Sequence, residues 1–331
     1  MARYKYEAQR AVGAFNHQDY YKPVGSASSS CISTMTMSLW ISGLLLISIT
    51  GTHGLSRFPE NFVVAKMNDA KPVILTCGTE EPVTWKHGDH VLEDYGDDII
   101  QHEGQNLSFS DVDSPILGEY SCWAGEKMIS STYLLLEAQE EEDLDSLISC
   151  WANSYNCNFT CNWNDTRYSV RLGLGPECTE GGKSCHWVSS YDRLQGGGFQ
   201  FVLSHSLSPY AEESTMLELT AQAILNHSIH KIKKMFYLRD IIRPDSPKIV
   251  TWQDVGQELK VTIEPPSTWS TPLSFFRLEH EIEYIRKHDG KVGRSLSALI
   301  PKGIVKMRVR SRDLLVPLNW SEWTLWKNVT Q

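Results

Sequence analysis

Three arginines that alternate with smaller residues near the C-terminus constrain the fold more than any other feature. Arg308, Arg310 and Arg312 lie two residues apart in the stretch MRVRSRD. Successive side chains of a strand point to opposite faces, so a strand here places all three guanidinium groups on one face. Trp320 and Trp323 follow after a turn-like segment. We expect these indoles to lie against the arginine face, where each stacked pair contributes about 0.5–2 kcal/mol.

The composition of the chain favours β-sandwiches. The 331 residues are enough for two or three domains, and 11 Trp and 14 Pro occur with few long apolar helical patterns, which predicts many short strands. Residues 215–225 fit a strand or a short helix, and their context favours a strand. The net charge is −9 and no basic block is interleaved with aromatic residues, so nucleic acid is not an expected partner.

An apolar run at residues 38–49, SLWISGLLLISI, is typical of the hydrophobic core of a signal peptide and is too short to span a membrane. A long polar stretch precedes it, so Met35 or Met37 is the expected start, or the extension is an alternative first exon. We assign residues 1–54 to an N-terminal extension and signal peptide. The product is expected to be secreted, extracellular and not inserted in a membrane.

N-x-S/T sequons agree with passage through the secretory pathway, because glycosylation takes place there. They lie at Asn106, Asn158, Asn164, Asn226, Asn319 and Asn328. Any single sequon can arise by chance. Together with the apolar run and the cysteines, they are consistent with a glycoprotein.

Closely spaced cysteines occupy residues 150–185. Cys150 and Cys161 lie eleven residues apart, and Cys178 and Cys185 lie seven apart around two glycines, which suits a hairpin staple. The alternative is a zinc site formed by Cys157, Cys161, Cys178, Cys185 and His186. It is disfavoured because the C-x-x-C spacing is missing and secreted thiols usually pair. If the pairs form, Cys157 is left as a free thiol or an intermolecular bridge.

Four residues further upstream resemble the signature of an immunoglobulin domain. Cys77, Trp85, Tyr120 and Cys122 match its two bridging cysteines, the tryptophan packed on them and the corner tyrosine. The resemblance implies a disulfide between Cys77 and Cys122, worth about 4 kcal/mol in the chain-entropy model. These four residues hold a fold together and bind nothing.

The C-terminal tryptophan stretch resembles the WSxWS signature of the cytokine-receptor family. Ser321 and Thr324 complete it, and the threonine keeps the hydroxyl of the usual serine. The family has this motif at the end of its second fibronectin type III domain. The stretch SCWANSYNCNFTCNW at 149–163 resembles the upstream domain, and the resemblance implies disulfides Cys150–Cys161 and Cys178–Cys185.

Two further stretches, FYLRDIIRPDSPK at 236–248 and EPPSTWSTPLSFFRLE at 264–279, resemble the interleukin-12 beta-subunit family of secreted receptor-like chains. The resemblance implies an all-β fold with one immunoglobulin-like domain followed by two fibronectin type III domains. We expect these domains at residues 55–140, 141–243 and 244–331. The acidic run 137–145 is interpreted as a connector, and the prolines within 240–247 predict a stiff elbow.

The resemblance also implies where partners bind. A four-helix-bundle alpha chain is expected at the bend between the fibronectin type III domains, and a cell-surface receptor of the interleukin-12 type at the immunoglobulin domain. Asp313 matches a family aspartate that pairs with an alpha-chain arginine; the alternative is a loop aspartate without a partner. Phe275 matches a contact tyrosine, with burial in its own core as the alternative. Glu212 matches an acidic contact on a poorly aligned stretch.

Two positions depart from the family pattern. A family tyrosine falls at Leu315, so the polar part of that contact is lost. The family cysteine that bridges to the alpha chain falls near Leu207 or Ser208, where this chain has no thiol. A covalent heterodimer through this position is therefore excluded, and Cys157 can serve only from another surface.

Enzymatic signatures are incomplete. His280 and Glu281 begin an HExxH motif, but Tyr284 occupies the place of the second histidine. Gly196–Gly198 lack the strand and helix of a phosphate loop. We predict a cytokine subunit without a cofactor that is not an enzyme, and leave homodimers open. The competing hypothesis is a soluble cytokine receptor, or a decoy or adhesion ectodomain.

Overall fold

A computed structural model of the chain describes residues 55, 57–67, 69, 71–92, 99–139, 144–179, 184–190, 193–317 and 319–329. The expected signal peptide lies outside these residues. In this described part, no helix combines the length and the apolar character needed to cross a membrane.

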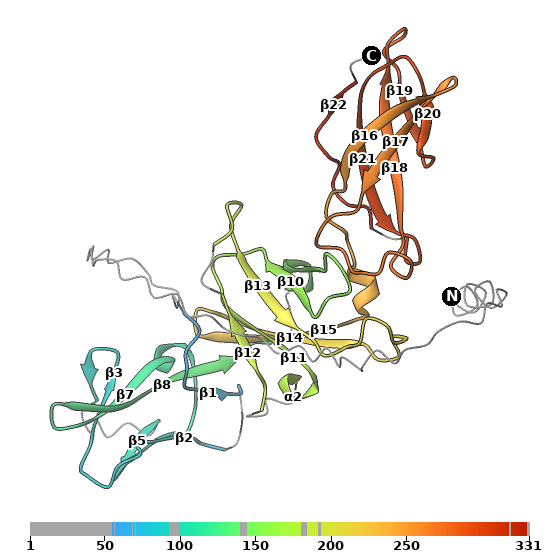
Figure 1. The fold of residues 1–331 in the computed structure, drawn as a ribbon. Helices are drawn as coiled ribbons and strands as arrows, with labels where there is room; N and C mark the ends of the chain where they lie inside the picture. The colour runs from blue at the N-terminus through green and yellow to red at the C-terminus, as the bar shows by residue number, and fades with distance from the viewer. Residues whose placement is uncertain are drawn as a thin grey trace, which may run out of the picture.

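The described chain is mostly β-strand and forms three units of two sheets each (Figure 1). The first unit contains β1 (Phe62–Ala65), β2 (Val73–Thr76), β3 (Thr84–His87), β4 (His90–Val91), β5 (Ile100–Glu103), β6 (Asn106–Phe109), the 3-10 helix η1 (Ser114–Ile116), β7 (Gly118–Ala124) and β8 (Lys127–Glu137). The second contains the 3-10 helix η2 (Leu144–Leu147), β9 (Ile148–Trp151), β10 (Asn158–Trp163), β11 (Ser169–Leu174), α2 (Pro176–Thr179), β12 (Trp187–Ser189), β13 (Phe199–Ser204), β14 (Leu217–Leu225), β15 (Ser228–Phe236) and the 3-10 helix η3 (Leu238–Ile241). The third contains β16 (Lys248–Val255), β17 (Glu258–Glu264), β18 (Leu278–Arg286), β19 (Val292–Ser295), β20 (Leu299–Pro301), β21 (Ile304–Asp313) and β22 (Lys327–Asn328).

Each unit buries the inward-facing side chains of two sheets. Strands β4-β3-β7-β8 face β2-β6-β5 in the first unit, β12-β11-β14-β15 face β13-β10-β9 in the second, and β19-β18-β21-β22 face β16-β17-β20 in the third. Alternate residues of β21 are buried, as the period-two pattern predicts. The fold is all-β and consistent with one immunoglobulin-like domain followed by two fibronectin type III domains.

The core of the first unit surrounds a disulfide. Cys77 follows β2 and is bonded to Cys122 of β7, so the bond joins the two sheets. Trp85 is 2% exposed and lies opposite Cys122 in the pairing of β3 with β7. The hydroxyl of Tyr120 donates a hydrogen bond to the carbonyl oxygen of Ile116 at 2.6 Å. This is the corner bond of an immunoglobulin sandwich.

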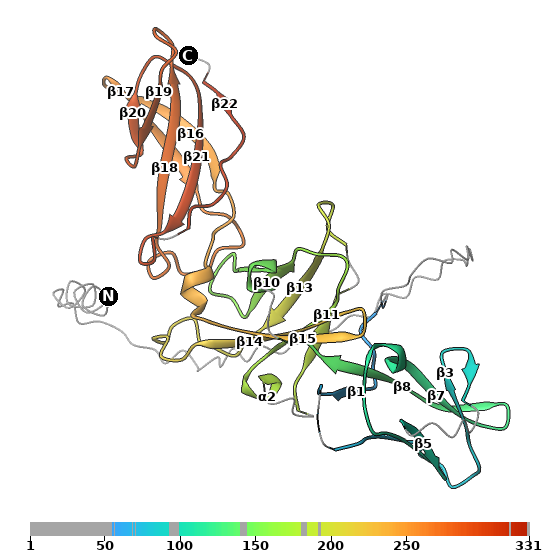
Figure 2. The ribbon, with the colours of Figure 1, turned by 180° about the vertical axis from the view of Figure 1, so that it is seen from behind.

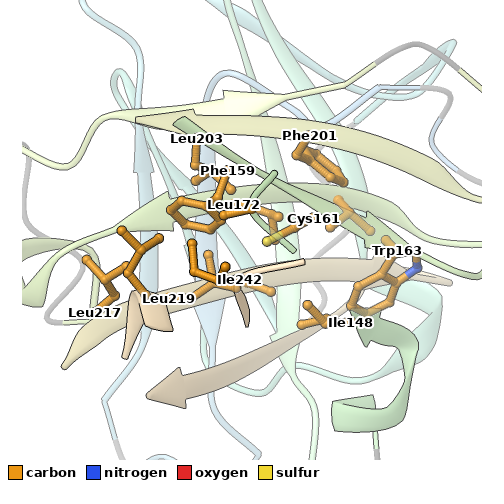
Figure 3. Packing of buried hydrophobic residues seen from close by; sticks show 14 of the residues in the cluster. Ile148, Phe159, Cys161, Trp163, Leu172, Phe201, Leu203, Leu217, Leu219 and Ile242 are labelled. Atoms are coloured by element: carbon orange, nitrogen blue, oxygen red, sulfur yellow. The ribbon is translucent and has the colours of Figure 1, made fainter. Parts of the chain in front are cut away.

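Side chains from both sheets meet in the core of the second unit (Figure 3). Cys161 is bonded to Cys150 directly across the β9–β10 pair, and Trp163 is fully buried two residues further on. Cys178 is bonded to Cys185. The expected hairpin staple is wrong in one respect, because Cys178 lies in the short helix α2 rather than in a strand.

All cysteines in the described part of the chain are disulfide-bonded. This includes Cys157, whose bond is additional to the three described above. The expectation of a free thiol is therefore wrong, and the partner of Cys157 lies outside the described residues. Because the sulfurs of Cys161, Cys178 and Cys185 are bonded to other sulfurs, the zinc alternative also fails.

A continuous sheet joins the first two units. The end of β8 pairs in parallel with the start of β15, with Leu136 opposite Ser228 and Glu137 opposite Ile229. The run expected to be a connector therefore begins as a paired strand. A small cluster with Leu135 at its centre packs across the same junction. The third unit bends away from the second, as the views from opposite sides show (Figures 1 and 2).

Candidate functional site

The bend between the second and third units is built around Tyr155, from the loop between β9 and β10. Its ring lies 5.4 Å from the ring of Phe276 and 6.0 Å from the indole of Trp269, measured between centroids. Both partners are 4% exposed, and the indole nitrogen of Trp269 donates to the carbonyl oxygen of Phe276 at 2.9 Å. The backbone nitrogen of Tyr155 donates to the hydroxyl of Ser270 at 3.0 Å. The two units therefore share a dry aromatic contact with satisfied polar groups.

Asp313 is the last residue of β21. Its carboxylate connects this aromatic contact to the loop that follows β21. It is 3% exposed. One carboxylate oxygen accepts a 2.6 Å hydrogen bond from the hydroxyl of Tyr155, and the other accepts the backbone N–H groups of Leu315 at 2.7 Å and Val316 at 3.3 Å. The alternative of a loop aspartate without a partner is wrong. Burial, with the nearby carboxylate, also raises the pKa of the Tyr155 hydroxyl, which stays protonated and able to donate.

Exposed apolar side chains gather beside this buried contact. We define the elbow surface as Tyr210, Leu273, Phe275, Leu314 and Leu315, whose exposed fractions run from 38% to 59%. The hydroxyl of Tyr210 donates to the carbonyl oxygen of Thr271 at 3.2 Å, and its ring centroid lies 5.5 Å from that of Phe275. The backbone nitrogen of Leu314 donates to the carbonyl oxygen of Arg277 at 3.0 Å. These bonds bring three separate loops to one place.

The other two expected contact residues lie on different loops, Glu212 on the loop of Tyr210 between β13 and β14, and Phe275 on the loop between β17 and β18. Glu212 is exposed, two residues after Tyr210, whereas the neighbouring Glu213 turns inward and accepts the backbone N–H of Arg239 at the start of η3. Phe275 is 48% exposed, and its neighbour Phe276 takes the core position. The alternative of a buried Phe275 is therefore wrong.

The arginine strand forms the interleaved stack that the alternation predicts. The guanidinium of Arg312 lies 4.3 Å from the ring centre of Trp320, that of Arg310 lies between Trp320 at 4.6 Å and Trp323 at 4.4 Å, and that of Arg308 lies 4.8 Å from Trp323. Trp326 continues the stack beyond Trp323, at 4.6 Å from Arg308. Trp326 was not among the predicted residues, although it repeats the three-residue spacing of the two tryptophans before it.

Carboxylates of β18 hold the other side of each guanidinium. The Nε atoms of the three arginines donate at 2.7 Å to the glutamates opposite them, in the pairs Arg308–Glu283, Arg310–Glu281 and Arg312–Glu279. Glu283 also accepts the Nε of Arg294 at 2.8 Å. Burial alone would raise the pKa of Glu283, but the two guanidinium groups outweigh it and lower that pKa. The alternation of Glu279, Glu281 and Glu283 could have revealed these partners.

The hydroxyls of the tryptophan motif bind the backbone of β21. The Oγ of Ser321 accepts the N–H of Ser311 at 2.9 Å, and the Oγ1 of Thr324 accepts the N–H of Val309 at 3.0 Å. Threonine therefore fills the place of the usual serine. The motif and ladder are structural elements of the third unit.

Together these features define the class of the protein. It is a receptor-like chain of disulfide-bonded β-sandwiches with a bent pair of fibronectin type III units and a stacked Arg–Trp ladder. Residues 145–225 match the family described as cytokine interleukin-12p40 C-terminus.

Similar proteins extend this match beyond the second unit. The chain is 29% identical over 287 residues to interleukin-12 subunit beta of Lama glama, 26% over 284 residues to that of Homo sapiens and 27% over 287 residues to that of Bos taurus. Each alignment covers 76% of this chain and 84% of the relative. The chain is therefore a distant homologue of interleukin-12 subunit beta over most of its length, and the match to the interleukin-12 p40 C-terminal family lies in its second unit. That family consists of cytokine subunits, which are not enzymes.

Proposed function

We propose that this chain is a secreted cytokine subunit that binds a four-helix-bundle alpha chain at the elbow surface and then engages a cell-surface cytokine receptor. The observation that carries the proposal is the gathering of five exposed apolar side chains at the bend. Solvent-exposed apolar residues that are contiguous and supported by a rigid base are typical of protein-binding sites. The disulfides support secretion, because such bonds persist in oxidising compartments.

The elbow surface is proposed to bind the side of a helix. Loops from two units contribute to it, so an amphipathic helix that lies across the bend buries apolar residues spaced three and four apart against both units. Glu212 supplies an exposed carboxylate at the rim for a basic residue of the partner. Asp313 is buried beside this surface and accepts the backbone N–H of Leu315, which holds Leu315 in place. An alpha-chain arginine that pairs with this carboxylate has to displace the hydroxyl of Tyr155.

The heterodimer is proposed to be non-covalent at this surface. Leu207 is half-buried and Ser208 is exposed, and neither offers a sulfur. We also propose that the three units act as domains with boundaries near residues 140 and 243. Each unit has its own main cluster of buried residues, which supports these boundaries, and Trp269 and Phe276 of the third unit pack against the cluster of the second.

Co-secretion with candidate alpha chains tests the proposal. We expect a four-helix alpha chain to be recovered with this chain from the medium, and the two to separate on a non-reducing denaturing gel. Phe275→Ser and Leu315→Ser should each reduce recovery at least tenfold, because truncation of a central apolar anchor typically costs about 2 kcal/mol or more. Val292→Ser is the matched control. Val292 is an apolar residue of similar exposure, 55%, and it lies on β19 and outside the elbow surface. Equal recovery of all three variants would contradict the proposal.

The missing thiol favours one alternative, a soluble receptor or decoy that binds a free helical cytokine reversibly. An alpha chain that depends on this subunit for its own secretion supports the subunit proposal. A cytokine that is secreted alone and binds only when added afterwards supports the decoy.

A further inference from the structure

Asn319 bridges the second and third units with its side-chain amide. The nitrogen Nδ2 donates to two carbonyl oxygens, those of Asp240 and Ile242, each at 3.2 Å. Asp240 belongs to η3 and Ile242 follows it, whereas Asn319 begins the tryptophan motif. Both hydrogens of the amide are therefore used, and both bonds cross the bend.

This geometry conflicts with the expected sequon Asn319-Trp320-Ser321. An N-linked glycan replaces one of the two hydrogens on Nδ2 and adds a bulky sugar at that nitrogen. The nitrogen of Asn319 lies in a half-buried contact between two units, so the sugar would have to occupy the space of the segment 240–242. The other expected acceptors, Asn106, Asn158, Asn164, Asn226 and Asn328, are exposed.

Neighbouring bonds show that the motif docks as a whole on this segment. Glu322 forms an ion pair with Arg243, and its carbonyl oxygen accepts the hydroxyl of Ser246 at 2.9 Å. The backbone of Arg243 in turn donates to the carbonyl oxygen of Ala152 at 2.8 Å, in the loop that carries Tyr155. The amide of Asn319 therefore lies in a chain of contacts that leads to the elbow surface.

We infer that Asn319 stays unglycosylated in the folded, secreted protein and that its free amide locks the third unit onto the second. A chain glycosylated at Asn319 cannot close this bend. The sequon is thus a structural element, and the glycans are confined to exposed positions.

Occupancy is measured on the secreted wild-type chain. Enzymatic release of N-glycans converts a glycosylated asparagine to aspartate, so peptide mass spectrometry reads each position directly. We expect residue 319 to remain asparagine, and Asn319→Gln to leave the apparent mass unchanged. Aspartate at residue 319 after release, or a loss of mass in Asn319→Gln, would overturn the inference.

The lock is measured by hydrogen exchange. Asn319→Asp keeps the shape of the side chain and removes both donors, and Asn328→Asp is the matched control at an exposed sequon. Loss of two hydrogen bonds should speed exchange of the backbone N–H of Arg243 and of Ala152, which donates to Ile241, about tenfold. Unchanged exchange in Asn319→Asp would overturn the lock. If that variant is not secreted, Asn319→Ala replaces it, because alanine removes the donors without facing two carbonyl oxygens with a charge.

Discussion

Asp313 combines a structural role with a proposed binding role. Replacing it with alanine removes the hydrogen bonds that its carboxylate accepts from three neighbouring groups. Asp313→Ala leaves the hydroxyl of Tyr155 and the backbone N–H groups of Leu315 and Val316 without their acceptor. We expect the free energy of unfolding to fall by about 2–4 kcal/mol, since buried donors without partners carry their full desolvation cost. Capture of an alpha chain should weaken as well, because Leu315 loses its anchor.

Tyr155→Phe is the control for this prediction. It removes only the bond between the phenol hydroxyl and the carboxylate, at 2.6 Å, and keeps the aromatic contact. Its unfolding midpoint in urea should fall less than that of Asp313→Ala. Wild-type stability and wild-type capture in Asp313→Ala would show that neither role is correct.

Glu283 gives the third unit a pH-dependent stability. Its pKa in the folded chain is lower than the ordinary value of 4.5, because Arg294 and Arg308 outweigh the effect of burial. A depressed carboxylate pKa means that the unfolded chain takes up protons first as the pH falls. The contribution of Glu283 is therefore complete above about pH 4.5 and is lost as the pH falls through the folded pKa.

Glu283→Gln tests this sign. The variant keeps the size of the side chain but not its charge, so it should lose about 1–3 kcal/mol at about pH 7 and show a flatter decline in stability between about pH 5 and pH 3. Urea unfolding at a series of pH values measures both. Glu258→Gln is the control at an exposed carboxylate. Parallel pH curves for Glu283→Gln and the wild type would contradict the assignment.

At the level of elements, Arg171 of β11 holds the N-terminal strand region of the first unit against the second. Its guanidinium lies 4.4 Å from the ring centre of Phe58 and 4.2 Å from that of Trp187, and two of its nitrogens donate to the side-chain oxygen of Gln222 at 2.9 and 2.7 Å. Burial lowers the pKa of Arg171 to about 10. A planar group with two parallel donors is needed here, and lysine does not supply it.

Arg171→Lys should therefore lower the free energy of unfolding by about 1–2 kcal/mol and speed hydrogen exchange in β1 and β8. Arg167→Lys is the control, because Arg167 pairs with Asp165 while its side chain is 71% exposed. Thermal unfolding and hydrogen exchange measure the two effects. Equal results for both substitutions would show that the stacked geometry of Arg171 contributes nothing.

The same elements show what the sequence could predict. Strand β21 and the tryptophans against it followed from period two and from short spacing, because local alternation fixes which side chains share a face. The parallel pairing of β8 with β15 joins residues far apart in the chain, such as Leu136 and Ser228, and no local pattern specifies it. The bond between Tyr155 and Asp313 spans 158 positions and was missed for the same reason. The likeness to a family supplied Asp313 but not its partner within the chain.

On the scale of the whole molecule, charge is divided unevenly along the chain. Residues 55–139 contain three times as many Asp and Glu residues as Lys and Arg residues, whereas residues 244–331 contain more basic than acidic residues. A field of this kind steers the approach of a partner of opposite sign and is screened by salt. For the proposed receptor, we therefore expect a basic face opposite the acidic first unit.

The association rate with an interleukin-12-type receptor ectodomain tests this steering. We expect the rate to fall about tenfold between about 50 and 500 mM salt, with a smaller change in the dissociation rate, because steering acts before contact. Neutralising Glu80, Asp89 and Glu103, which are exposed in the first unit, should remove much of the salt dependence. Neutralising the exposed Glu258 and Glu264 of the third unit should not. If both sets of substitutions reduce the salt dependence equally, net charge alone sets the association rate. The acidic first unit would then not steer the receptor.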